Sequence, residues 1–142
     1  MPENELTVEK YPDPRDLEFL ENQLNSYNIA KTGIDFGGEL AIFVRNSEGR
    51  IIAGISGFTW GNYTEIKYLW VDEDLRGQGY GSRLLQAAEE EARRRGSRML
   101  YLDIHSFQAS DFYPKFGFEA VGVLENCPVE GYKRYFFRKI LS

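Results

Sequence analysis

Alternation of apolar and polar residues, the pattern typical of half-buried β-strands, runs through much of this chain. It predicts strands at 40–45, 51–60 and 65–71. Further strands are expected at 118–124, at 132–141 and at 98–104, a strongly apolar segment typical of a strand covered on both faces, with a short additional strand at Leu6 and Val8. Residues 46–49 (NSEG) predict a hairpin turn between the first two of the longer strands. Residues 34–39, which include two adjacent glycines, predict a flexible loop.

Two longer segments have the spacing of helices. The first begins at Asp13 and Pro14, an N-cap followed by a first-turn proline, and runs to Gly33 with apolar residues at Leu17, Leu20, Leu24 and Tyr27. The second ends at Gly96, and its apolar stripe consists of Leu84, Leu85, Ala88 and Ala92. A short third helix is expected over 109–116, ended by Gly117. The expected order of elements is β-α-β-β-β-α-β-α-β-β, and the length of 142 residues predicts one domain, residues 1–142.

Composition fits a globular domain and narrows the classes of partner. Of the 142 residues, 42% are hydrophobic and 15% aromatic, and the net charge is −5. Nucleic acid is not an expected partner, because nucleic-acid-binding modules usually carry a basic patch. The sequence has no long apolar run and no signal-peptide pattern, and the single cysteine, Cys127, has no second cysteine to pair with. We therefore expect a cytoplasmic protein without a membrane segment.

Residues 76–82 (RGQGYGS) lie between a predicted strand and a predicted helix. Gly77, Gly79 and Gly81 remove three Cβ atoms where the helix begins, so a ligand can approach the bare backbone. A helix start also offers unpaired N–H groups and the positive end of the helix dipole, which suit a phosphate. Ser82 adds a hydroxyl group and Arg76 a cation. The loop is therefore a candidate anion-binding site.

This loop resembles the signature of the GNAT superfamily of N-acetyltransferases: Arg or Gln, two residues, Gly, one residue, then Gly or Ala. Arg76, Gly79 and Gly81 match it. A second match is to the pattern A-x-x-x-Y-x-x-x-G-F, which is fitted by Ala109, Tyr113, Gly117 and Phe118. The resemblance covers most of the chain, from about residue 52 to residue 141. It implies an α/β (α+β) fold with a central twisted sheet of about six to seven strands, mixed but mostly antiparallel, and helices on both faces.

The resemblance also implies acetyl-coenzyme A as co-substrate, with no metal. In the family, the amides of this loop hold the coenzyme's pyrophosphate, while its pantetheine arm pairs with the strand that precedes the loop. The cofactor-binding residues expected on this basis are Leu69, Trp70, Val71, Arg76, Gly77, Gln78, Gly79, Tyr80, Gly81, Ser82, Ser106 and Ala109. Ser106 is a departure, because the family often has asparagine there.

Two residues are expected to be catalytic through the same resemblance. Tyr113 matches the family tyrosine that protonates the departing thiolate, and a phenol is protonated at pH 7. Glu65 matches a glutamate that acts in some members as the general base, directly or through water. Strand alternation would place Glu65 with Lys67 and Leu69 on one face. The structural alternatives are that Tyr113 is a core residue and that Glu65 is a solvated charge at the end of a strand. His105 is an alternative base.

The function implied is transfer of an acetyl group from acetyl-coenzyme A to a primary amine of a small molecule or peptide, directly in a ternary complex. One alternative is a non-catalytic acyl-coenzyme A sensor on the same fold. Another is a dinucleotide-binding oxidoreductase, because Gly77, Gly79 and Ser82 approximate G-x-G-x-x-G/A, and Asp103 follows at a suitable distance.

The acceptor side is less determined by sequence. The acidic balance favours a cationic acceptor. An acceptor pocket lined by aromatic side chains is a further hypothesis, with Phe58, Trp60, Tyr63 and Trp70 as its residues. A homodimer that uses the aromatic segment 132–137 is expected by analogy with the family.

Overall fold

A computed structural model describes residues 4–142 of the chain. The chain divides into two compact units, one ending at Asp35 and the other running from Phe36 to Ser142. The second unit contains the sheet and the candidate site, so the two units are described separately below.

Helix α1, Pro14–Thr32, belongs to the first unit. The Asp13 side chain caps it by accepting a hydrogen bond from the Arg15 N–H at 2.9 Å, and Gly33 ends it in the left-handed conformation. The predicted helix is therefore confirmed at both ends. None of its residues is buried. The strand expected at Leu6 and Val8 does not form, and both side chains are almost fully exposed, so they have no apolar surface to pair against.

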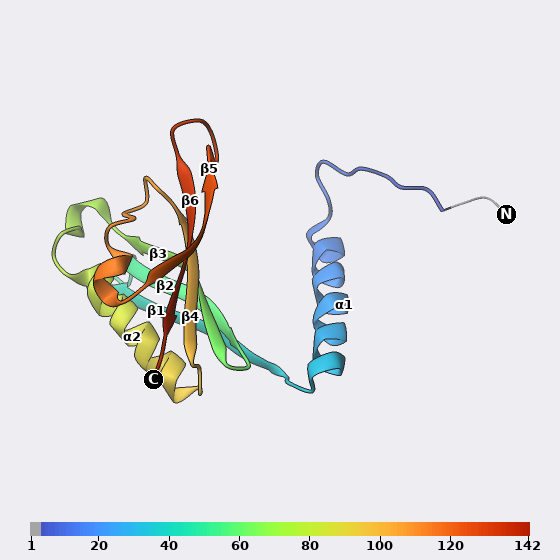
Figure 1. The fold of residues 1–142 in the computed structure, drawn as a ribbon, viewed down its shortest axis with the longest axis horizontal. Coiled ribbons are helices and arrows are strands. Elements are labelled where there is room, and N and C mark those ends of the chain that lie inside the picture. The colour runs from blue at the N-terminus through green and yellow to red at the C-terminus, as the bar shows by residue number, and fades with distance from the viewer. Residues whose placement is uncertain (1–3) are drawn as a thin grey trace. The chain divides into compact units, whose positions relative to one another are not determined.

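Six strands form one sheet in the second unit, in the order β1-β2-β3-β4-β6-β5 (Figure 1). Their bounds are β1 Phe36–Arg45, β2 Ile51–Trp60, β3 Tyr63–Val71, β4 Met99–His105, β5 Glu119–Glu125 and β6 Lys133–Ile140. All neighbouring pairs are antiparallel except β3 and β4, which run parallel. The expected mixed, mostly antiparallel sheet is confirmed, and the predicted hairpin turn at 46–49 joins β1 to β2.

Helix α2, Tyr80–Arg94, packs against β1, β2 and β3 and closes the core (Figure 1). Its four buried residues are the predicted apolar stripe: Leu84, Leu85, Ala88 and Ala92. They join a cluster that includes Leu40, Ile55, Leu100 and Leu102 from the strands. The helix is amphipathic because its charged residues fall on the opposite side, as the spacing predicts.

Strands β3 and β4 separate after a short parallel ladder. Only three residue pairs connect them, and the last is Glu65 opposite Tyr101, although β3 continues to Val71 and β4 to His105. A buried chain of hydroxyl groups fixes the joined end: Thr64 Oγ1 lies 2.8 Å from Thr59 Oγ1 and 2.7 Å from Ser97 Oγ. The sheet therefore forks, and the β3 edge beyond Glu65 has no β4 partner.

A β-bulge in β3 overturns the predicted arrangement of faces. Ser56 pairs with Tyr68, but the next residue, Gly57, pairs with Ile66, so Lys67 is the extra residue. Beyond Lys67 the alternation is reversed: Leu69 packs against the core, and Trp70 turns to the other face. The prediction that Glu65 shares a face with Leu69 is therefore wrong.

Gly57 explains why the bulge lies here. A Cβ atom on Gly57 would lie 1.9 Å from the carbonyl oxygen of Glu65, so only glycine lets the two strands approach this closely.

Two further segments differ from their predictions because of local backbone geometry. The segment expected to be a loop, 34–39, contains the start of β1, where the register shifts between Phe36 and Gly38. The helix expected over 109–116 is only a 3-10 turn, Tyr113–Phe116. Ala109 has a φ of 57°, in the left-handed region, which prevents an α-helix from beginning there.

Candidate active site

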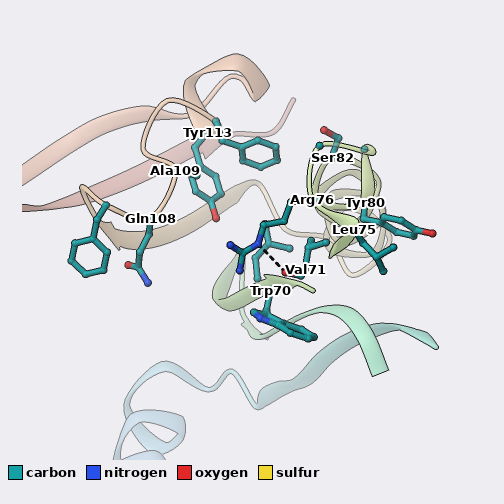
Figure 2. A pocket seen from close by; sticks show the side chains of 15 residues that line it. Trp70, Val71, Leu75, Arg76, Tyr80, Ser82, Gln108, Ala109 and Tyr113 are labelled. Carbon is teal, nitrogen blue, oxygen red and sulfur yellow. Dashed lines mark hydrogen bonds between the residues drawn. The ribbon is translucent and has the colours of Figure 1, made fainter. Parts of the chain in front are cut away.

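A cleft of about 700 Å³ opens where β3 and β4 have separated. The end of β3, the loop before α2, the first turn of α2 and the segment 107–113 surround it (Figure 2). Its size is that of a small-molecule or cofactor site. The lining residues are Leu69, Trp70, Val71, Leu75, Arg76, Gly77, Gly79, Tyr80, Gly81, Ser82, Phe107, Gln108, Ala109, Phe112 and Tyr113.

The glycine loop presents unpaired backbone donors to this cleft. Gly77 and Gly79 have φ values of 79° and 87°, and Gly79 is the N-cap of α2. The first intrahelical bond is donated by the Arg83 N–H to the Gly79 carbonyl at 3.1 Å. Among residues 4–142, no acceptor is recorded for the N–H groups of Tyr80, Gly81 and Ser82. These donors and the positive end of α2 suit a phosphate, which is the fit expected for a coenzyme pyrophosphate.

Arg76 and Gln78 differ in how they relate to the cleft. Arg76 donates from Nε to the Val71 carbonyl oxygen at 3.1 Å, and this bond holds the loop against the end of β3 (Figure 2). Gln78 instead donates from Nε2 to the Asp74 carbonyl at 3.3 Å and does not line the cleft. Its side chain therefore stabilises the loop, and only its main chain is left for a ligand.

The end of β3 supplies an open strand edge. Leu69, Trp70 and Val71 pair with β2 on one side, and the separated β4 leaves their other side to the cleft. A linear amide-containing ligand can add to such an edge through main-chain hydrogen bonds. Trp70, 49% exposed, is the aromatic residue of the predicted acceptor set that lines the cleft; Phe58, Trp60 and Tyr63 do not.

Tyr113 combines a buried ring with a hydroxyl group in the cleft. Its residue is 6% exposed, and its ring contacts those of Phe112, Phe118 and Phe137. Figure 2 shows the hydroxyl end directed into the cleft. Every buried side-chain polar atom among the described residues has a hydrogen-bond partner, and none is recorded for this hydroxyl group, so it is accessible from the cleft. Burial raises the pKa of Tyr113, which keeps the phenol protonated at neutral pH.

Glu65 lies at the joined end of the fork and not in the cleft lining. Burial raises the pKa of its carboxyl group; the nearby Lys67 opposes this effect and the nearby Asp103 adds to it. A raised pKa makes a carboxylate a better proton acceptor near neutral pH. A role for Glu65 in the cleft therefore requires an intervening water or acceptor group.

Ser106, His105 and Ala109 belong to the segment that follows β4. Ser106 makes two hydrogen bonds with the main chain of Lys133, one through its N–H at 2.8 Å and one accepted by Oγ at 3.1 Å. It does not line the cleft, whereas Ala109 does. The His105 ring stacks on the Phe107 ring, and its Nδ1 atom lies 3.2 Å from Gln108 Oε1. His105 is likewise absent from the lining.

Sequence reasoning did not find four residues that line the cleft: Leu75, Phe107, Gln108 and Phe112. Phe107 and Gln108 lie three and four residues after the end of the predicted strand 98–104, and Phe112 precedes the matched tyrosine. The segment that follows the end of a strand is a position where ligand contacts are common, and it was the available signal.

Comparison with known proteins gives the class of this chain. The model of the acetyltransferase (GNAT) family matches residues 4–118. An acetyltransferase of Agrobacterium fabrum, Atu2258, is 35% identical over 105 residues, or 74% of this chain and 77% of the relative. Blasticidin-S acetyltransferase of Streptomyces morookaense is 30% identical over 89 residues, or 62% of this chain and 65% of the relative.

Solved structures agree with the sequence comparisons. An acetyltransferase from Bacillus cereus has a TM-score of 0.78 and 34% identity, covering 95% of this chain and 98% of its own. A structure from Agrobacterium tumefaciens, assigned provisionally to the acetyltransferases, has a TM-score of 0.88 and 30% identity, covering 97% and 100%. The chain therefore belongs to the GNAT family and is an acetyltransferase.

Family membership and the mixed sheet exclude the dinucleotide-binding alternative, because that fold is built on a mostly parallel sheet. Within residues 4–142, no cluster of three or more His, Cys, Asp or Glu side chains is arranged to hold a metal ion. In the same part of the chain, neither helix combines the length and apolar character needed to cross a membrane.

Proposed function

We propose that this acetyltransferase uses acetyl-coenzyme A to acetylate a primary amine, by direct transfer while both substrates are bound. One observation carries the proposal: a single cleft brings together the N–H groups at the start of α2, the open edge of β3 and the Tyr113 hydroxyl group. These are the three kinds of group that an extended thioester ligand with a pyrophosphate at one end requires.

The coenzyme would be held by main-chain groups of this chain. The donors of Tyr80, Gly81 and Ser82, with Arg76 nearby, suit its pyrophosphate, and the β3 edge at Leu69–Val71 suits the amides of its pantetheine arm. When bound, acetyl-coenzyme A supplies a thioester, which is an activated acetyl donor. A backbone N–H at Trp70 or Val71 would donate to the oxygen that becomes negative during transfer.

Two side chains would move the protons. Tyr113, protonated at neutral pH, would donate its phenolic proton to the departing sulfur. Glu65 would accept the ammonium proton of the acceptor through water, because it lies outside the cleft lining. An alkyl amine with a pKa of about 10.4 is only about 1 part in 10³ neutral at pH 7, so removal of this proton is worth about 4 kcal/mol.

The acceptor is a small molecule or peptide with a primary amine, and the acidic balance of the chain favours one that is cationic. Blasticidin S belongs in a first panel of acceptors, because a relative 30% identical to this chain is named for acetylating it. Polyamines, aminoglycosides and peptides with a free amine complete the panel.

The test is an assay of thiol release with acetyl-coenzyme A and each amine of the panel. The proposal predicts amine-dependent release of one thiol for each acetylated product found by mass spectrometry, and a fall of about 10²-fold in the rate of both in Tyr113→Phe. Acetylation of a hydroxyl group, or release that does not depend on an amine, would contradict it. Binding of coenzyme A without any turnover across a broad panel would favour the sensor alternative.

A further inference from the structure

Glu65 is surrounded by charged and phenolic groups from three strands, on the sheet face opposite α2. The groups are Tyr63 and Lys67 on its own strand, Tyr101 and Asp103 on β4, and Arg134 on β6. Tyr101 is the register partner of Glu65 in the last pair before the fork, and Asp103 is the next residue of β4 on the same face. Within residues 4–142, no hydrogen bond or ion pair is recorded for the Glu65 carboxyl group.

Asp103 is held in place by two neighbours. Arg134 donates from Nε and Nη2 to Asp103 Oδ1 at 3.0 and 2.5 Å, and the Tyr101 hydroxyl group lies 3.4 Å from Asp103 Oδ2. The hydrogen bond to Asp103 raises the pKa of Arg134, so the guanidinium group stays charged beside Asp103. The ion pair is partly buried, with the two side chains 26% and 36% exposed, so water screens it only in part.

We propose that Asp103, fixed by Arg134, is a positioning residue for the base Glu65: it holds a second negative charge beside Glu65 and thereby strengthens its attraction for the acceptor's ammonium proton. The inference rests on the proposed role of Glu65. The physical reason is that two neighbouring carboxylates resist being ionised together, so the one without a cationic partner binds a proton more readily. Here Asp103 has a cation within ion-pair distance and Glu65 has none, although Lys67 on the same strand opposes the effect of Asp103 on Glu65.

The test is a titration of Glu65 in the free protein by carboxyl ¹³C NMR, with its signal assigned from Glu65→Gln. Asp103→Asn removes the neighbouring charge and should lower the midpoint of Glu65 by about 0.5 pH units or more. Asp103→Glu keeps the charge and should restore most of the shift. Arg134→Gln leaves Asp103 without its cation and should move the midpoint of Glu65 in the opposite direction, upward.

Glu119→Gln is the matched control. Glu119 also pairs with an arginine of β6, Arg138, at 2.9 Å, but it comes from β5 and is not among the groups that act on Glu65. It should leave the Glu65 midpoint unchanged. If the titration midpoint of Glu65 is the same in Asp103→Asn as in Glu119→Gln, the inference is wrong. If Asp103→Asn does not fold, Arg134→Gln decides: an upward shift supports the inference, and an unchanged midpoint overturns it.

The result is independent of whether Glu65 is the base. The NMR midpoint reports the effect of Asp103 on Glu65, whereas the pH dependence of turnover in Glu65→Gln reports the role of Glu65 in transfer. A shifted midpoint with an unaltered rate profile would therefore overturn the base assignment and leave the coupling in place. An unshifted midpoint with a changed rate profile would overturn the coupling between Asp103 and Glu65 and leave the base assignment in place.

Discussion

At the scale of single residues, Tyr113 has a structural and a chemical environment at once. Its ring packs among Phe112, Phe118 and Phe137, and its hydroxyl group reaches the cleft. A core role and a catalytic role are therefore not alternatives for this side chain. They involve different atoms, and a single substitution separates them.

Tyr113→Phe removes the hydroxyl group and leaves the ring contacts in place. We expect the melting temperature to change little, and turnover to fall by about 10²-fold, the usual scale for loss of a general acid. The loss should appear in kcat as well as in kcat/KM, because the hydrogen bond strengthens only as charge develops on sulfur. Steady-state kinetics with the best acceptor of the panel measures this. Near-wild-type kcat would show that the departing thiolate receives its proton elsewhere.

Glu65→Gln tests the base through the pH dependence of the rate. The pKa of Glu65 is raised, chiefly by burial, so its carboxylate form is available above that raised value and is lost as pH falls through it. The wild-type rate should therefore decline on the acid side at a higher pH than an ordinary glutamate would give. The variant should be slow at neutral pH and recover partly at high pH, where free amine is abundant. A wild-type pH–rate profile in Glu65→Gln would show that Glu65 is not the base.

At the scale of elements, the fork between β3 and β4 and the bulge in β3 shape the site. The bulge turns Trp70 toward the face opposite α2 and Leu69 toward the core, and both residues line the cleft. It depends on close contact between Gly57 and the backbone at Glu65.

Gly57→Ala tests this dependence. The added Cβ would lie 1.9 Å from the Glu65 carbonyl oxygen, so the strands must move apart, and we expect a loss of about 2 kcal/mol or more in unfolding free energy. Gly54→Ala in the same strand is the control. Its Cβ would meet a movable group, the Phe43 ring, at 2.9 Å, and should cost less. Chemical denaturation measures the unfolding free energy of both variants. Equal losses would show that the close approach at the bulge has no special role in stability.

The sequence predicted those elements whose signals are local. The stripe on α2, the Asp13 cap, the Gly33 end of α1 and the hairpin turn at 46–49 all depend on residues within a few positions of one another. It did not predict the faces of β3, because the bulge is determined by Gly57 on another strand. Nor did it predict that an α-helix is absent over 109–116, because the positive φ of Ala109 cannot be recognised in the residue pattern.

At the scale of the whole molecule, the two predicted motifs converge on one cleft although they are separated along the chain. Arg76, Gly77, Gly79 and Gly81 line it together with Ala109 and Tyr113. Glu65, Gln78 and Ser106 were expected near the ligand, but their side chains do not line the cleft. Spacing in the sequence could place the loop and the tyrosine, since each belongs to a motif. It could not show that Gln78 bonds to Asp74 or that Ser106 bonds to Lys133.

The cationic acceptor and the single domain over residues 1–142 remain predictions. So does the homodimer through the segment 132–137. The central claim, that this cleft binds coenzyme A, does not depend on them, because the groups that would hold the coenzyme line one cleft in the unit 36–142.

The most direct test of that claim is calorimetric titration with coenzyme A of wild-type protein, Gly79→Val and Gly96→Val. Gly79 and Gly96 flank α2 with φ values of 87° and 89°, and a Cβ on either meets nothing within 4 Å. Valine should therefore impose similar backbone strain at both, of at least about 1 kcal/mol, but only Gly79 adjoins the donors that face the cleft. We predict that Gly79→Val abolishes binding and Gly96→Val preserves it. Wild-type affinity in folded Gly79→Val would contradict this loop as the coenzyme site.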